Sequence, residues 1–210
     1  MPGRKPTAAR LRPPEGASRR PPRPYQQGAL DGLCGVYAVT NSLALLCPEL
    51  THEACRRLFR VVLRGQVEAS GTSVASLWKG CGPRKLRCLL RLATEHVRAA
   101  HGLPVHATWP EANPKTLAAL WCALESELQA GHLVIVGLAG VHRHWTVIRR
   151  ITPDTLWLAD SDGLSLLRRS RCTLRLRANR HRLDPREIVV LTRSDLGWGA
   201  SDTMMGRKSG

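Results

Sequence analysis

The chain has 210 residues, of which 43% are hydrophobic, so it is long enough to bury the core of one domain without disulfide bonds. Its seven cysteines are odd in number, irregularly spaced and free of any CxxC pair, which argues against a disulfide framework and against a structural zinc site. The formal net charge is +16, carried almost wholly by arginine. No apolar run is long enough to span a bilayer, and reduced thiols fit a cytoplasmic location.

The N-terminal segment, residues 1–24, differs in composition from the rest of the chain. It carries seven Lys or Arg residues, one Glu and many prolines. Such a segment cannot bury enough apolar surface to offset the entropy of ordering, so it is predicted to be disordered. The prolines also argue against the amphipathic helix of a transit peptide. We therefore expect a disordered basic segment over residues 1–24, one domain over 25–194, and a flexible tail over 195–210.

The first half of the domain has the apolar spacing of helices. Four helices are predicted, and a short fifth is expected over Val74–Trp78. The four run from Cys34 to near Cys47, from a Thr51 cap to about Leu63, from Pro83 to Gly102, and from an Asn113-Pro114 start to Gly131.

From His132 onward the pattern changes to that of strands. The predicted strands are Leu133–Leu138, His144–Arg149, Leu156–Ala159, Thr173–Arg177 and Ile188–Thr192. Helices gathered first and an antiparallel sheet later make an α+β fold, with the N-terminal helices packed against the C-terminal sheet.

Cys34 is the first candidate for chemistry. It stands beside glycine at the start of an almost wholly apolar helix, where backbone N–H groups and the helix dipole stabilise a thiolate. Most free cysteines are small buried hydrophobes, and the remaining cysteines on predicted helix faces fit that role. The position of Cys34 favours a nucleophile instead.

A base and an orienting carboxylate come from the strands. His144 lies near the start of one predicted strand and Asp160 at the end of the next, and these two ends meet in a tight hairpin. His142, two residues before His144, is the alternative base, and Asp162, two residues after Asp160, is the alternative carboxylate. His144 is preferred because the apolar run after it anchors it in a core strand, and Asp162 precedes a glycine in the manner of a turn residue.

These motifs resemble the papain-like cysteine peptidases. The run from Asp31 to Ala38 (DGLCGVYA) with Asn41, the HWTV strand at His144, and the strand end at Asp160 are most similar to the bacterial C39-like branch. The resemblance covers roughly residues 25–193 in the order Gln, Cys, His, Asp. It implies a papain-like fold whose cleft binds an extended peptide or protein substrate, and a peptidase that needs no cofactor.

The resemblance also implies a glutamine that donates to the oxyanion, usually six positions before the cysteine. That position is Gly28 here, so we assign the role to Gln27 and keep Gln26 as the alternative. Loss of one oxyanion donor typically costs ~10²–10³ in rate, so a displaced glutamine weakens such an enzyme without abolishing it.

Other function classes stay open on the sequence alone. A transglutaminase-like or acyltransferase enzyme uses the same triad with an amine in place of water. A metalloprotein would use Cys34, His142, His144 and an aspartate at 160 or 162. A non-catalytic module would hold nucleic acid or an acidic partner through the eight arginines of Arg168–Arg186, but no aromatic residues interleave them, which favours a solvated face.

Overall fold

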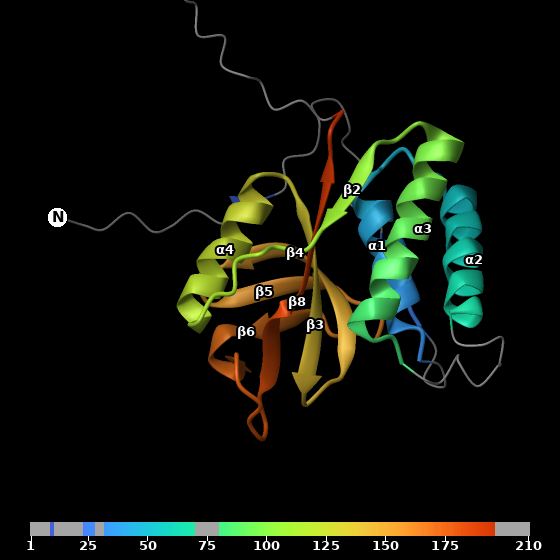
Figure 1. Cartoon of the computed structure of the whole chain (residues 1–210). Helices are drawn as coiled ribbons and strands as arrows, with labels where there is room; N and C mark the ends of the chain where they lie inside the picture. Colours follow the sequence, from blue (N-terminus) through green and yellow to red (C-terminus); the bar gives the residue numbers. More distant parts are fainter. Residues whose placement is uncertain (1–8, 11–22, 28–31, 70–79, 196–210) are drawn as a thin grey trace, which may run out of the picture.

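A computed structural model describes residues 9–10, 23–27, 32–69 and 80–195. Three helices lie on one side of an antiparallel sheet and a fourth covers the other face (Figure 1), which confirms the α+β class. The helices are α1 (Cys34–Leu46), α2 (His52–Glu68), α3 (Pro83–His101) and α4 (Leu117–Gln129). The longer strands are β2 (Val105–Thr108), β3 (Leu133–Gly140), β4 (His144–Thr152), β5 (Thr155–Ala159), β6 (Leu166–Arg168) and β8 (His181–Arg193).

The main path of the sheet runs β2-β8-β3-β4-β5-β6, with each neighbouring pair antiparallel. The two-residue strand β7 (Cys172–Thr173) pairs with β8 in parallel. Ala9 and Arg10, within the segment for which the sequence predicts disorder, form β1 and pair with β4. The hairpin of β4 and β5 has the connection that the sequence predicts.

Alternation along β3 divides the core into two halves. Ile135 joins the cluster that contains the apolar residues of α1 and α3, whereas Val134 and Val136 join the cluster beneath α4. Side chains at successive strand positions point to opposite faces, so β3 can serve both cores. Helix α1 lies innermost, and eleven of its thirteen residues are buried. The predicted nucleophile therefore stands at the start of the most enclosed helix.

Local capping explains where the helices begin and end. Thr51 caps α2, since its Oγ1 accepts a hydrogen bond of 3.2 Å from the backbone N–H of Ala54. Helix α3 begins at Pro83 as predicted and ends at Gly102, whose φ of 68° is the left-handed conformation that glycine adopts readily.

Some predicted elements were wrong. Helix α4 begins three residues after the expected Asn113-Pro114 start, because the Thr116 side chain supplies the cap by accepting the N–H of Ala119 at 3.1 Å. The predicted strand Thr173–Arg177 reduces to β7, since the residues after Thr173 pair with no strand in the described chain. Strands β2 and β6 were missed, and the expected helix at Val74–Trp78 and the C-terminal tail beyond residue 195 lie outside the described residues.

None of the helices in the described ranges combines the length and the apolar character that crossing a membrane requires.

Candidate active site

Cys34 is the first residue of α1 and is 8% exposed. The N-cap residue, Leu33, offers no side-chain acceptor, and the first turn contains no acidic residue. The positive end of the helix dipole therefore lies at Cys34 and is not neutralised by a side chain of this helix.

His144 and Asp160 meet at the end of the β4–β5 hairpin. Atom Nε2 of His144 lies 2.8 Å from Oδ2 of Asp160, and the two side chains are only 7% and 1% exposed. The ring N–H does not point straight at the carboxylate, so this contact is a close charge pair more than a linear hydrogen bond. Since Nε2 faces Asp160, Nδ1 is the ring nitrogen left for Cys34, the other side chain that interacts with His144.

Protonation of this group is set by opposing effects. Burial by itself would lower the pKa of His144, but the polar contacts and charges of Asp160 and Cys34 overcome it and raise that pKa to about 9. Burial would raise the pKa of Asp160, but His144, Thr146 and the backbone of Asp162 lower it below its ordinary value. The arrangement therefore favours an imidazolium beside a carboxylate at neutral pH.

The Asp160 carboxylate is held on its other side by backbone groups. Its Oδ1 accepts hydrogen bonds from the N–H of Asp162 at 2.7 Å and from the N–H of Leu164 at 3.0 Å. The side chain of Asp162, the alternative carboxylate, is exposed in the turn. Thr146 lies two positions after His144, on the same face of β4, and also acts on Asp160. Sequence reasoning missed Thr146, although this spacing was a usable signal.

His142, the alternative base, does not join this group. It is exposed, and its ring lies parallel to that of His181 with the centroids 5.8 Å apart. In the described ranges, no three His, Cys, Asp or Glu side chains are grouped closely enough to hold a metal ion.

The two glutamines have different partners. The side-chain Nε2 of Gln26 donates to the backbone oxygen of Asp160 at 2.9 Å. The backbone N–H of Gln27 donates to the carbonyl of Ser161 at 2.8 Å, and its side-chain Oε1 accepts from the Ser161 hydroxyl at 3.1 Å. Among the residues that the structure describes, the Nε2 of Gln27 has no acceptor. Ser161 therefore holds the Oε1 end of the Gln27 amide, whereas the Nε2 donor of Gln26 is bound to Asp160.

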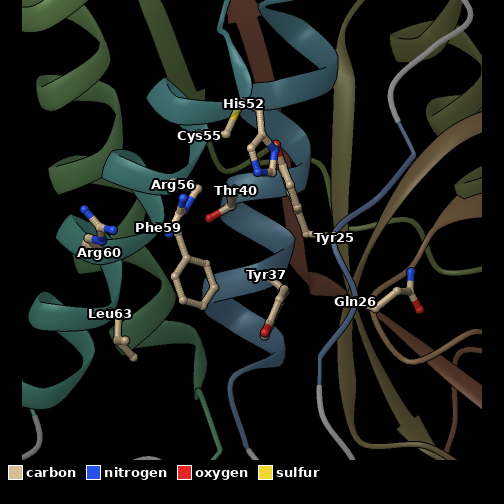
Figure 2. A pocket seen from close by; sticks show the side chains of 10 residues that line it. All are labelled: Tyr25, Gln26, Tyr37, Thr40, His52, Cys55, Arg56, Phe59, Arg60 and Leu63. Atoms are coloured by element: carbon tan, nitrogen blue, oxygen red, sulfur yellow. The ribbon is translucent and has the colours of Figure 1, made fainter.

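A pocket of about 470 Å³ lies between the segment at Tyr25 and Gln26 and helices α1 and α2 (Figure 2), and Cys34, His144 and Asp160 are not among the described residues that line it. Tyr37, one turn after Cys34, lines it opposite Phe59, and the two ring centroids are 5.0 Å apart. Arg56 and Arg60 line its α2 side, and its described lining contains no acidic residue. The pocket thus combines an aromatic wall with two arginines, of which Arg56 forms an exposed ion pair of 3.7 Å with Glu53.

The arginine-rich segment Arg168–Arg186 is partly committed to internal contacts. Arg180 donates to the carbonyl of Ser170, and Arg182 and Arg186 both contact the buried Asp184 carboxylate. The other exposed arginines are the ones left for an outside partner: Arg168, Arg171, Arg175 and Arg177.

Comparison with known proteins adds no identification. No protein-family model matches this chain, and no curated protein matches it either. What the site can do therefore follows from its own residues.

Proposed function

We propose that this protein is a cysteine peptidase with a papain-like fold of the C39-like branch, hydrolysing a peptide, isopeptide or related acyl bond. Cys34 is the nucleophile, His144 the acid and base, and Asp160 the residue that orients the imidazole. The observation that carries the proposal is the buried 2.8 Å contact between His144 and Asp160. The same imidazole also interacts with the thiol of Cys34, which stands at a helix N-terminus.

The chemistry runs in two stages. The Cys34 thiolate attacks the substrate carbonyl carbon, and the π electrons of the C=O bond move onto oxygen. When the tetrahedral intermediate collapses, the C–N bond breaks and the His144 imidazolium gives its proton to the leaving amine. Neutral His144 then takes a proton from water, which attacks the thioester, and the C–S bond breaks to release the acid and restore the thiolate and imidazolium.

The oxyanion of both stages needs donors. The backbone N–H of Cys34 and the Nε2 of Gln27 are proposed for this role. Support for Gln27 over Gln26 comes from the hydrogen bond of Ser161 to the Gln27 Oε1, which leaves Nε2 as the end of the amide available to donate.

The pocket favours a peptide that carries an acidic side chain. Arg56 and Arg60 stand four residues apart on one face of α2, and only a weak exposed ion pair of 3.7 Å with Glu53 offsets the charge of Arg56. A substrate carboxylate would find an arginine in Arg60, while an apolar neighbour packs against Tyr37 and Phe59. An acyltransferase that uses an amine in place of water needs the same triad, and cross-linked product after addition of an amine acceptor would favour it.

Competitive labelling tests the proposal without a known substrate. The protein is treated with a limiting thiol-reactive probe near pH 6, and the adduct is located by peptide mapping. Exposure alone predicts that Cys88 and Cys122, which are exposed, react before the buried Cys34. The proposed triad predicts the reverse order, because it assigns the His144 imidazole as the partner of the Cys34 thiol.

Two variants sharpen the result. His144→Ala should abolish the preference for Cys34, whereas His142→Ala, an exposed histidine in the preceding turn, should leave it intact. Labelling of Cys88 and Cys122 ahead of Cys34 in the wild type would overturn the proposal. Salt-dependent nucleic-acid binding that survives Cys34→Ala would then favour the non-catalytic alternative.

A further inference from the structure

We infer that Trp145 and Cys81 together are positioning residues that set the distance between Cys34 and His144. This inference rests on the proposed function. The two catalytic side chains belong to different layers, Cys34 to the helices and His144 to the sheet, and neither chain segment by itself fixes their separation. Trp145 and Cys81 form a chain of contacts between the two layers. One end of this chain is the residue after His144, and the other end contacts the residue after Cys34.

The sheet end of this path is Trp145, the residue after His144. Neighbouring strand positions point to opposite faces, so Trp145 points into the helical core while His144 and Thr146 point toward Asp160. The indole is 5% exposed and lies across Gly137 on β3, where an added Cβ would be 3.0 Å from the ring. Its Nε1 donates a short hydrogen bond to the backbone carbonyl of Cys81.

The helical end is Cys81, which stands just before the start of α3. Its side chain packs against Gly35, the residue after the nucleophile: a Cβ added to Gly35 would lie 2.6 Å from both the Cβ and the Sγ of Cys81. Burial raises the pKa of Cys81 to about 12, so this thiol is a packing group and not a second nucleophile.

The contacts therefore run from Gly35 to Cys81 to Trp145, and they join the residue after Cys34 to the residue after His144. An indole N–H that donates to a buried carbonyl is directional, and its loss leaves that carbonyl without the donor it has in the wild type. Small displacements between nucleophile and base reduce catalysis steeply, so this link should matter more for reactivity than for stability.

The chain offers a matched control. Trp121 on α4 is also buried, and its Nε1 also donates to a backbone carbonyl, that of Thr152 at 2.8 Å, at the far end of β4 from His144. Trp145→Phe and Trp121→Phe each delete one buried indole donor and retain an aromatic ring. Urea unfolding should show similar losses of stability for the two full-length variants.

Reactivity should separate them. The alkylation rate of Cys34 near pH 6 should fall about tenfold or more in Trp145→Phe, and the pH profile of that rate should move toward the profile of His144→Ala. Trp121→Phe should stay within about twofold of the wild type at every pH. A purely structural role for Trp145 predicts instead that both variants keep the wild-type profile.

A second variant covers the helical end in case Trp145→Phe does not fold. Cys81→Ala keeps the backbone carbonyl and removes the Sγ from Gly35, and it should slow Cys34 alkylation about threefold or more. Wild-type behaviour of either folded variant overturns the inference while leaving the proposed function intact. If wild-type Cys34 has no preferential reactivity, the proposed function itself fails, so the two failures are distinct.

Discussion

Replacing Asp160 with asparagine should show how much the buried charge pair of His144 and Asp160 contributes to the free energy of unfolding. The change retains an oxygen that can accept the backbone N–H groups of Asp162 and Leu164, but it removes the negative charge 2.8 Å from His144. Burial of the imidazole remains, and burial disfavours its charged form. In Asp160→Asn the pKa of His144 should therefore fall, and only its interaction with Cys34 would still raise it.

The magnitude follows from the shift. Raising the pKa of His144 from 6.5 to about 9 corresponds to about 3 kcal/mol of stabilisation of the imidazolium in the folded state. Because this pKa is raised, its contribution to folding is fully present below about pH 6.5 and is lost as the pH rises through about 9. The pKa of Asp160 is lowered from 3.8, so its contribution is present above about pH 4 and is lost as the pH falls through the folded value.

Urea unfolding at two pH values measures this effect. At pH 5.5, inside the window where both contributions are present, Asp160→Asn should be less stable than the wild type by about 2–3 kcal/mol, since Cys34 supplies part of the shift. At pH 10 the deficit should shrink to about 1 kcal/mol or less, because His144 is then largely neutral and the charge pair is lost. Asp162→Asn, in the same turn with an exposed side chain, should change stability by less than about 0.5 kcal/mol at both values. An equal deficit at pH 5.5 and pH 10 would refute the charge-pair reasoning.

Three further predictions concern the residues around the triad. Gln27→Ala should lower kcat by about 10²–10³-fold on any cleavable peptide while leaving Cys34 labelling intact. A larger loss of kcat in Gln26→Ala than in Gln27→Ala would instead make Gln26 the oxyanion donor. Gly35→Ala should lower the free energy of unfolding by about 1–3 kcal/mol in urea titrations, since its methyl group meets Cys81 at 2.6 Å, and an unchanged value would contradict that packing. Arg60→Glu should raise KM for peptides with an acidic side chain about tenfold with kcat little changed, and an equal rise for neutral peptides would argue against charge recognition by the pocket.

Features that depend on neighbouring residues could be predicted from the sequence. Thr51 capping α2 and Gly102 ending α3 are decided within one helical turn, and both were predicted correctly. The contact between His144 and Asp160 could also be predicted from the sequence, because a short hairpin fixes which strand ends meet. The start of α4 was missed for an equally local reason: two cap signals compete within four residues, and the sequence does not rank them.

Contacts between distant segments were decided only by the tertiary structure. The sequence places Cys34 at a helix start, but its interaction with His144 depends on how α1 packs against the sheet. The bond from Trp145 to Cys81 joins residues 64 positions apart, and that from Ser161 to Gln27 joins residues 134 apart. No periodicity or turn rule extends over such separations. Their geometry is set by the close packing of two layers, where each side chain takes the space and the hydrogen-bond partners that the others leave.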